Sequence, residues 1–273
     1  MLVKTARRLS SMILAGMRAG HQSSPIGRPI VIGAIGGSGT RVVVKILRHG
    51  GYFMGRNLNE SEDAMEFVEF YDCWINRFIR GNEAPLDEEE SDRMAREFDQ
   101  CIGRHRTAID SPQTPWGWKE PRSIYLLPFF RAKFPRIKFI QVIRDGRDMA
   151  FSQNHHQWRK HGAAVLGEQW ASAPQPVQMA ALWEIANLEV ASYGEQMGPD
   201  YLLVKYESLC GDPYGTIGRI LDFVRAPRTG ISAAAAEVRP PATIGRWRTA
   251  ADDALAKAIE AAAAKALHKF GYR

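Results

Sequence analysis

Residues 29–51, with the sequence PIVIGAIGGSGTRVVVKILRHGG, decide the fold of this chain. The first part, residues 30–35, is a short β-branched apolar run, which is typical of a buried parallel strand. A turn of small residues comes next and consists of Gly36, Gly37, Ser38, Gly39 and Thr40. Apolar residues then recur at helical spacing, at Val42, Val43, Ile46 and Leu47. We therefore predict a strand, a glycine turn and a helix in immediate succession.

This glycine turn is suited to binding an anion. Glycines let the backbone turn sharply and bring N–H groups close to a ligand, and the following helix directs the positive end of its dipole there. The loop of nucleotide hydrolases, G-x-x-x-x-G-K-[ST], also needs a lysine for the phosphates and a hydroxyl for Mg²⁺. Here Arg41 follows Thr40 and no lysine stands at the required place. A plain turn of a βα unit is the alternative, but the small residues and the arginine favour a phosphate or sulfate site without a metal.

The composition indicates one globular domain with an anionic partner. A chain of 273 residues can bury one large core, so we expect a single domain at 28–273, with a helical insertion at about 63–106, after a basic segment and linker at 1–27. The net charge is +6, and no acidic residue precedes Glu60, so the basic excess surrounds the glycine turn. Aromatic residues are not interleaved with these basic ones, and no helix-turn-helix or zinc pattern occurs, which argues against nucleic acid as the partner.

The ends and the cysteines bear on the cellular compartment. The apolar stretch at 12–17 is too short to span a bilayer, so we expect at most a peripheral membrane contact through the basic N-terminus. The three cysteines, Cys73, Cys101 and Cys210, lack the spacing of a zinc site or a disulfide framework. We expect a reducing compartment and a cytoplasmic protein, which can be membrane-peripheral.

Strand and helix patterns alternate along the chain, which predicts an α/β fold with a doubly wound, mainly parallel sheet and flanking helices. Further strands are expected at 116–119, 137–143 and 201–205, and the piece 52–54 is expected to return to the sheet. Helices are expected at 67–78, 86–104, 122–134, 177–197, 213–224 and 252–270. A loop is expected at 233–243, and a loop with some helix at 155–176. In such sheets ligands bind beyond the carboxyl ends of the strands. Lys119, Arg144 and Tyr206 lie at those ends, beside the glycine turn.

Five segments of the chain resemble, in order, those of the sulfotransferases that use 3′-phosphoadenosine 5′-phosphosulfate (PAPS). The glycine turn resembles their 5′-phosphosulfate loop, usually P-[KR]-S-G-T-T, and RDGRDMAFS, from Arg144 to Ser152, resembles their 3′-phosphate motif. WKEPR resembles the K-x-P piece of Golgi-type members, especially tyrosylprotein sulfotransferases. VKYESL, with Tyr206, is similar to the segment whose tyrosine lies by the adenine, and IGRWR, with Arg246 and Trp247, resembles the late G-x-W cap.

The resemblance spans residues 30–248 and implies a P-loop-NTPase-like fold and an enzyme. The implied reaction is in-line transfer of a sulfuryl group from PAPS to a hydroxyl of a carbohydrate, lipid, phenol or tyrosine, with adenosine 3′,5′-bisphosphate (PAP) as product and no metal. The implied nucleotide-binding residues are Gly36, Gly37, Ser38, Gly39, Thr40, Arg41, Arg144, Ser152, Tyr206, Arg246 and Trp247. Two positions depart from the family, since Gly37 stands where a lysine or arginine is usual and Arg41 where a second threonine is. We expect Arg41 to supply the missing positive charge.

Sulfuryl transfer needs an in-line acceptor, cations over the transferred group and a base for the acceptor hydroxyl. Lys119 is the candidate for stabilising the equatorial oxygens, with neutralisation of Glu120 as the alternative role. The candidates for the base are Glu60 and Asp63, in the loop where several Golgi-type members carry a glutamate. A helix cap is the commoner role for Asp63. His105, His155 and His156 are further candidates for the base.

Two other functions fit parts of the pattern. A P-loop-type, ATP-dependent kinase or nucleotide-binding protein would explain the glycine turn, although the loop lysine is missing. A non-catalytic relative that binds the bisphosphate nucleotide without turnover would explain Gly37.

Overall fold

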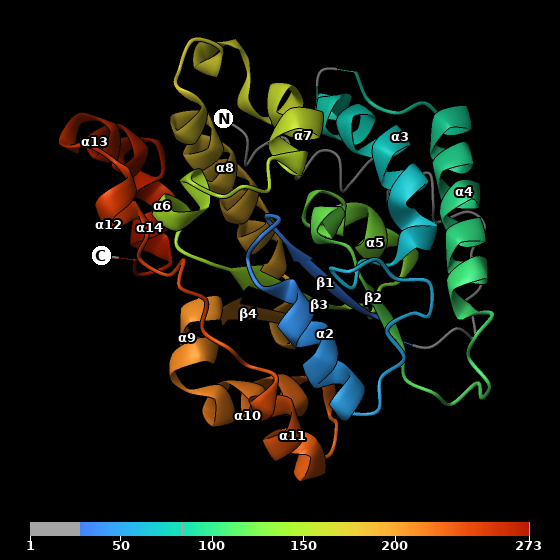
Figure 1. Cartoon of the computed structure of the whole chain (residues 1–273). Helices are drawn as coiled ribbons and strands as arrows, with labels where there is room; N and C mark the ends of the chain where they lie inside the picture. The colour runs from blue at the N-terminus through green and yellow to red at the C-terminus, as the bar shows by residue number, and fades with distance from the viewer. Residues whose placement is uncertain (1–27, 83, 273) are drawn as a thin grey trace.

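The computed structural model describes residues 28–82 and 84–272, so the basic N-terminal segment lies outside the described residues. The centre is a four-stranded parallel sheet in the order β2-β1-β3-β4 (Figure 1). Its strands are β1 (Ile30–Ala34), β2 (Gly117–Lys119), β3 (Lys138–Ile143) and β4 (Tyr201–Lys205). Ile32 of β1 is in register with Lys119 and with Ile140, and Ile143 is in register with Lys205. The predicted parallel α/β fold is confirmed.

The alternation of side chains along the strands divides the interior into two cores. Ile30, Ile32 and Ala34 pack on one face of the sheet, and Val31 and Ile35 pack on the other. Because consecutive side chains of a strand point to opposite faces, an apolar strand of this kind has to be covered on both sides.

Helices from different parts of the chain cover the two faces (Figure 1). The first face carries α2 (Thr40–His49), α9 (Tyr206–Gly211), α10 (Pro213–Val224) and α11 (Ile231–Ala236). The second face carries α3 (Val68–Ile79), α4 (Glu88–Arg106), α5 (Leu127–Lys133), α8 (Gln175–Glu195), α13 (Asp253–Ala262) and α14 (Ala264–Lys269). Two short helices, α6 (Gly146–Ala150) and α12 (Trp247–Ala250), and the longer α7 (His156–Leu166) lie beyond the carboxyl ends of the strands.

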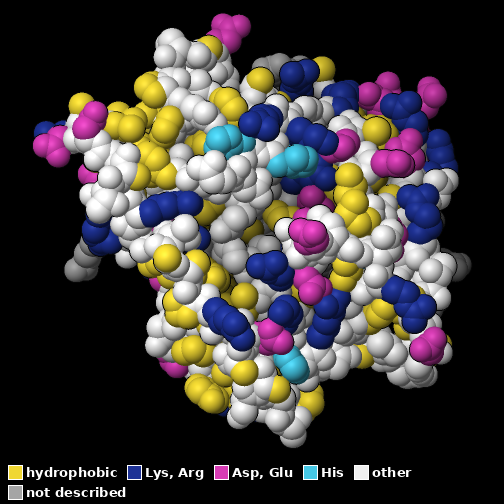
Figure 2. All heavy atoms as spheres, viewed as in Figure 1, with side chains coloured by type: hydrophobic (Ala, Val, Ile, Leu, Met, Phe, Trp, Pro, Cys, Tyr) yellow, Lys and Arg dark blue, Asp and Glu magenta, His cyan; other side chains and the backbone are white. Residues whose placement is uncertain are grey.

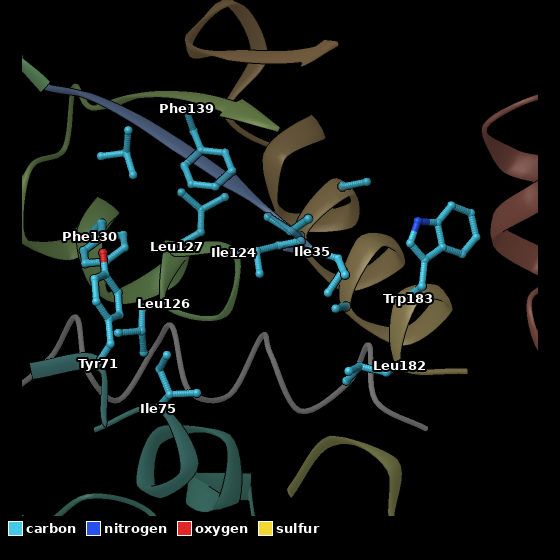
Figure 3. Packing of buried hydrophobic residues seen from close by; sticks show 14 of the residues in the cluster. Ile35, Tyr71, Ile75, Ile124, Leu126, Leu127, Phe130, Phe139, Leu182 and Trp183 are labelled. Atoms are coloured by element: carbon cyan, nitrogen blue, oxygen red, sulfur yellow. The ribbon is translucent and has the colours of Figure 1, made fainter. Parts of the chain in front are cut away.

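The aromatic residues of α3 belong to the core, as the helical spacing predicts. Tyr71 packs with Phe130 and Leu126 in the interior (Figure 3). The Tyr71 hydroxyl lies 2.7 Å from Ser123 Oγ and accepts a hydrogen bond from the Trp118 indole at 3.0 Å, so its polar end is also satisfied inside the protein. α4 begins with a capping box, in which Glu90 N donates to the Asp87 side chain.

Four of the predicted elements differ from the structure. The helix predicted at 122–134 is a 3₁₀ turn, Pro121–Tyr125, followed by α5, because Pro128 cannot donate the N–H that a continuous helix needs. The last helix is divided into α13 and α14, since Glu184 of α8 accepts the N–H groups of Lys265 and Ala266. The segment predicted as a loop at 233–243 contains part of α11, whereas the segment at 155–176 contains α7, in agreement with the predicted loop with some helix. The piece 52–54 reaches the sheet only through one isolated bridge, between Phe53 and Trp116.

In the part of the chain that the structure describes, no helix has the length and apolar character required of a membrane span.

Candidate functional site

The glycine turn lies between β1 and α2 with its backbone N–H groups available to a ligand. Gly37 and Gly39 have φ angles of +96° and +88°, which favour glycine. The Ser38 hydroxyl donates to the Ile35 carbonyl at 2.7 Å, which holds the turn closed. No side-chain hydrogen bond caps the described helix α2, and its first turn contains no acidic residue. Its N-terminus therefore retains the positive potential that attracts anions.

Side chains from two distant segments lie directly against this turn. A Cβ atom on Gly37 would lie 3.1 Å from Ser152 Oγ, and a Cβ on Gly36 would lie 2.9 Å from the amide of Asn154. A Cβ on Gly39 would lie 2.2 Å from the ring of Tyr206, closer than two carbon atoms can approach. The glycines are therefore required by packing as well as by backbone conformation. The structure brings together Ser152, Tyr206 and the glycine turn, three of the segments that the sequence motifs predict.

Arg144 directly follows the last residue of β3 and lies at the same edge of the sheet. Its guanidinium carbon lies 5.7 Å from the ring centroid of Tyr206. Nη2 donates to the carbonyl and hydroxyl oxygens of Thr243, at 2.5 and 3.0 Å, and lies 3.6 Å from Asp148 Oδ2. Arg144 thus forms a long ion pair with Asp148. Such a pair is what a purely structural role of Arg144 would involve. Nε is buried and has no hydrogen-bond partner among the described residues.

Asp148 connects the segment IGRWR, near the end of the chain, to the segment that begins at Arg144. Its carboxylate accepts the backbone N–H groups of Gly245 and Trp247, at 2.7 and 3.2 Å, and its carbonyl accepts Arg246 Nε at 2.9 Å. Burial, with the charge of Arg144 as the next cause, lowers the pKa of Arg246. The guanidinium carbon of Arg147 lies 4.0 Å from the Trp247 ring centroid. Arg246 and Trp247 are therefore held near Arg144, although they lie 102 and 103 residues away from it in sequence.

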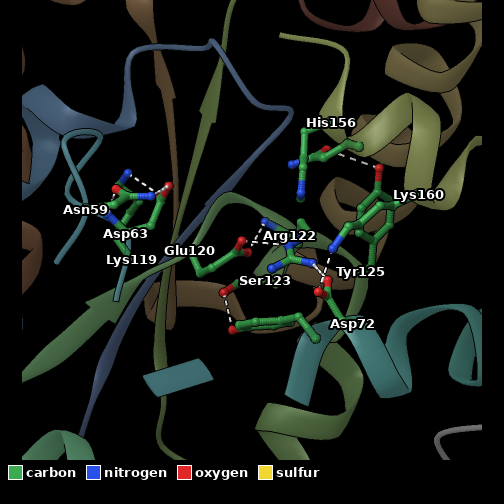
Figure 4. Close-up of polar contacts among 12 residues, drawn as sticks. Asn59, Asp63, Asp72, Lys119, Glu120, Arg122, Ser123, Tyr125, His156 and Lys160 are labelled. Atoms are coloured by element: carbon green, nitrogen blue, oxygen red, sulfur yellow. Dashed lines mark hydrogen bonds and ion pairs between the residues drawn. The ribbon is translucent and has the colours of Figure 1, made fainter. Parts of the chain in front are cut away.

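The side of the site towards α3 contains Lys119 and the loop before α3 (Figure 4). The Lys119 ammonium is buried and donates to Asp63 Oδ1 at 2.5 Å and to the Ser61 carbonyl. Asp63 Oδ2 accepts from Asn59 at 2.9 Å. Burial lowers the pKa of Lys119, and Asp63 opposes that shift. The ion-pair partner of Lys119 is therefore Asp63, whereas Glu120 is paired with Arg122 and acts on Lys119 only through its charge.

The other candidates in this loop are placed differently. Glu60 is exposed, and its carbonyl accepts from Arg41 Nη1 at 3.2 Å, so Arg41 spans from α2 to this loop. Asp63 does not cap a helix, because the next helical turn begins at Met65 with Ala64 as its cap residue. The cationic reach of Arg41 towards the glycine turn stays a prediction.

Glu120 and Arg122 form a buried pair beside the site. Arg122 Nε and its backbone N both donate to the Glu120 carboxylate at 2.6 Å, and Nη1 donates to Asp72 of α3. The second oxygen of Asp72 accepts from Lys160 of α7 at 2.5 Å. Figure 4 shows the imidazole of His156 directed towards Arg122. Charged groups from three elements thus form one connected network.

The three histidines named as candidate bases have different surroundings. His105 is buried in the aromatic core, 2.9 Å from the Gly117 carbonyl, and lies away from the glycine turn, so that candidate is wrong. His155 contacts Gln175 at 3.0 Å. His156 lies at the start of α7 and is exposed as a residue. Partial burial of its ring, followed by the charge of Arg122, lowers its pKa.

The sequence motifs miss several residues that build the site: Asn154, Gln157, Asp72 and Thr243. Gln157 donates to the carbonyl of Ala34, the last residue of β1, at 3.1 Å and fixes α7 to the base of the glycine turn. The side chain of Asn154 accepts the His156 N–H at 3.2 Å and starts α7. An Asn two residues before a helix is a visible signal, but it does not indicate contact with Gly36.

The two ends of a bisphosphate nucleotide can be tested against these residues. The glycine turn, which a Cβ would fill, offers a concave set of backbone donors for one phosphate. The unpartnered Nε of Arg144 and the hydroxyl of Ser152 are suited to a second anion. The residues therefore fit a nucleotide with a charged group at each end.

Comparison with known proteins identifies a family and a fold. Residues 29–230 match the sequence model of a protein family that is described as the sulfotransferase family. The sulfotransferase domain of the olefin synthase of Synechococcus PCC 7002 is 14% identical with a TM-score of 0.54, covering 93% of this chain and 99% of that chain. The sulfotransferase domain of the curacin biosynthetic pathway is 14% identical with a TM-score of 0.56, covering 90% and 99%.

A sulfotransferase of Mycobacterium avium is 12% identical with a TM-score of 0.53, covering 90% of this chain and 77% of that chain. A search of curated protein sequences gave no match. At these identities the structural likeness shows the fold.

Proposed function

Because that family's model covers most of its length, the chain belongs to the sulfotransferase family, and we propose that it transfers a sulfuryl group from PAPS to an acceptor hydroxyl. The chain is an enzyme of the sulfuryl-transferring class, and the donor and the acceptor are the proposed parts. One observation carries the proposal of the donor: Ser152 Oγ lies beside Gly37, so the 3′-phosphate motif and the glycine turn form neighbouring anion sites.

Each nucleotide-binding residue then has a defined task. The N–H groups of the glycine turn hold the 5′-phosphate, while Arg144 and Ser152 hold the 3′-phosphate. Tyr206 packs on Gly39 and lies near Arg144, so its ring is offered to the adenine of the nucleotide. In the transfer, the acceptor oxygen forms a bond to sulfur as the bond from sulfur to the 5′-phosphate oxygen breaks. The proton of the acceptor hydroxyl goes to the catalytic general base, and PAP leaves.

The geometry favours Glu60 over Asp63 as the base. Asp63 already accepts hydrogen bonds from Lys119 and Asn59, one on each carboxylate oxygen, so both oxygens are engaged. Glu60 is exposed, and the contact of its carbonyl with Arg41 holds it near the start of α2. Asp63 would instead hold the Lys119 ammonium in position for the oxygens of the transferred group.

The experiment is a sulfuryl-transfer assay with PAPS, in which PAP release and the sulfated product are both measured by mass spectrometry. Glu60→Gln is expected to lower kcat by about 10²- to 10⁴-fold, the usual contribution of a general base, with the Kd for PAP unchanged. The control is Glu69→Gln, which alters an exposed carboxylate in the first turn of α3. Wild-type turnover in Glu60→Gln, together with its loss in Asp63→Asn, would assign the base to Asp63.

The same assay, repeated with ATP in place of PAPS, separates the sulfotransferase from the two alternative functions. A kinase would release ADP from ATP in a Mg²⁺-dependent way. A non-catalytic relative would bind PAP and release no product from PAPS with any acceptor.

A further inference from the structure

We infer that the acceptor is a neutral, polyhydroxylated molecule of the carbohydrate kind, bound by the charge network of Glu120, Arg122, Asp72 and Lys160. This inference deepens the proposed function and rests on it. The network crosses three parts of the fold, since Arg122 follows β2, Asp72 lies on α3 and Lys160 lies on α7. Figure 4 shows these residues on one side of the site and Asp63 with Lys119 on the other.

The network lies beside the proposed point of sulfuryl transfer. Glu120 directly follows Lys119 at the end of β2, the strand next to β1. Gln157, next to His156, donates to the carbonyl of Ala34 at the base of the glycine turn. Figure 2 shows a hollow near the middle of this face, with basic, acidic and histidine side chains around it. An acceptor that contacts the network would therefore lie close to the 5′-phosphate end of the donor.

The burial of the network changes from its inner to its outer end. The side chain of Arg122 is 2% exposed, whereas those of Asp72 and Lys160 are 35% and 39% exposed. The inner pair is fixed by hydrogen bonds, and the outer pair can reach a ligand. Two carboxylates and two cations sum to no net charge, so the network would select neither a strongly anionic nor a cationic acceptor.

A hydroxyl group matches this pattern, because it donates one hydrogen bond and accepts others. It can donate to Asp72 while it accepts from Lys160. Several hydroxyls on one scaffold could use both outer charges at once, which a phenol or a simple alcohol with one hydroxyl cannot.

His161 adds an independent observation. The residue is buried on α7, and its Nδ1 lies 2.8 Å from Asn76 Oδ1. Its Nε2 is buried and has no hydrogen-bond partner among the described residues. Burial, followed by the charge of Arg122, lowers the pKa of His161 to about 4, so the ring is neutral and Nε2 is an acceptor. A buried acceptor of this kind requires a donor, and a ligand hydroxyl or a water can supply it.

Among the described residues, α3 offers few of the flat apolar walls that phenols, sterols and fatty alcohols require. The aromatic side chains of α3, namely Phe70, Tyr71, Trp74 and Phe78, are at most 5% exposed and belong to the core. Among the described residues, the exposed large hydrophobic side chains are Met65, Tyr214 and Ile244, and none of them lies on α3 or α7. Apolar acceptors of those classes would thus find few partners here.

The test compares acceptors of different classes with PAPS as donor: a neutral oligosaccharide, an oligosaccharide with uronic acids, 4-nitrophenol, a tyrosine peptide and a long-chain alcohol. We expect kcat/KM to be highest for the neutral oligosaccharide. Asp72→Asn and Lys160→Met are expected to raise its KM about tenfold, the order of one charged hydrogen bond, with kcat and the Kd for PAP little changed. The matched controls are Asp92→Asn and Lys257→Met, at exposed positions on α4 and α13.

The outcomes separate this inference from the proposed function. Preference for a phenol, a tyrosine peptide or a long-chain alcohol, with normal PAP binding, would overturn the inference alone. An unchanged KM for the neutral oligosaccharide in both variants would also overturn it. Failure to bind PAP, measured by calorimetry, would overturn the proposed function and this inference together. Saturation-transfer NMR with the neutral oligosaccharide and PAP gives a second measurement, since binding should weaken in both variants and not in the controls.

Discussion

Gly39 is a single position at which two physical constraints coincide. Its φ of +88° strains any other residue, and a Cβ there would enter the ring of Tyr206. We predict that Gly39→Ala weakens PAP binding at least tenfold and lowers the free energy of unfolding by about 1–3 kcal/mol, the usual cost of overpacking and backbone strain. Denaturant unfolding and calorimetry measure the two effects.

Gly103 provides the matched control for this substitution. It lies inside α4, has no positive φ, and a Cβ there meets nothing within 4 Å. Gly103→Ala should therefore stabilise the chain by about 0.5–1 kcal/mol, because glycine is a poor helix former, and leave PAP binding unchanged. Equal effects of the two substitutions would show that the glycine turn has no special requirement.

Arg144 is the residue on which recognition of a 3′-phosphate depends. Arg144→Ala removes a charged donor with an unpartnered Nε. We predict a loss of about 1–3 kcal/mol, or roughly 5- to 150-fold in the Kd for PAP, as for other hydrogen bonds to charged groups. Arg219→Ala, at an exposed position on α10, is the control. Unchanged affinity in Arg144→Ala, measured by calorimetry, would remove Arg144 from the site.

The residues that could be predicted from the sequence are those in local motifs. The glycine turn, Arg144, Ser152 and Tyr206 follow from strand ends and short spacings. The partners of these residues could not be predicted, because Thr243 meets Arg144 only after the chain has passed through β4 and the six helices α6 to α11. Asp72 is the fifth residue of α3, a helix whose aromatic side chains belong to the core. Nothing in the sequence indicates that its carboxylate contacts Arg122.

At the scale of elements, the contact between α3 and α7 depends on a neutral histidine. Asn76 of α3 donates to the Lys160 carbonyl at 2.9 Å, and His161 bonds to the other side of the same amide. The pKa of His161 is about 4, below its ordinary value of 6.5. Between these pH values the unfolded chain binds more protons than the folded chain, so stability falls as the pH falls. The full shift corresponds to about 3 kcal/mol.

His161→Asn tests this dependence, since an asparagine amide can still donate to Asn76 but does not titrate. We predict that the free energy of unfolding, measured in urea from pH 7 to pH 4, decreases less steeply in His161→Asn than in the wild type. His268→Gln, at an exposed position on α14, should keep the wild-type slope. Parallel slopes in all three proteins would show that His161 does not control the acid sensitivity.

Most elements could be predicted because their hydrophobic periods are long and regular. The breaks could not be predicted in the same way. Pro128 lies within an apolar run that otherwise reads as one helix, and the division between α13 and α14 depends on Glu184, which is 81 residues away from Lys265. Helix boundaries set by a side chain of another helix are tertiary contacts, and a local pattern does not contain them.

At the scale of the whole molecule, the site is assembled from the ends of all four strands and from the segment near the C-terminus. Arg144 and Asp148 hold Thr243 and Gly245, which lie beyond the residues that the family model matches. Glu207 accepts from the Tyr272 hydroxyl at 3.0 Å and links that segment to α9, the helix that directly follows β4. A ligand that joins these parts should therefore stabilise the whole chain and not one loop.

The last prediction is the resulting shift in melting temperature. At a PAP concentration about 100 times its Kd, binding to the folded state alone adds about 2.7 kcal/mol of stability. For a chain of this size each kcal/mol corresponds to about 2–4 °C, so the Tm should rise by about 5–10 °C. Adenosine 5′-monophosphate at the same concentration should raise it far less, because Arg144 and Ser152 then lack their phosphate, and ATP should act only weakly. Equal shifts with and without the 3′-phosphate, in differential scanning calorimetry, would contradict the assignment of two separate anion sites.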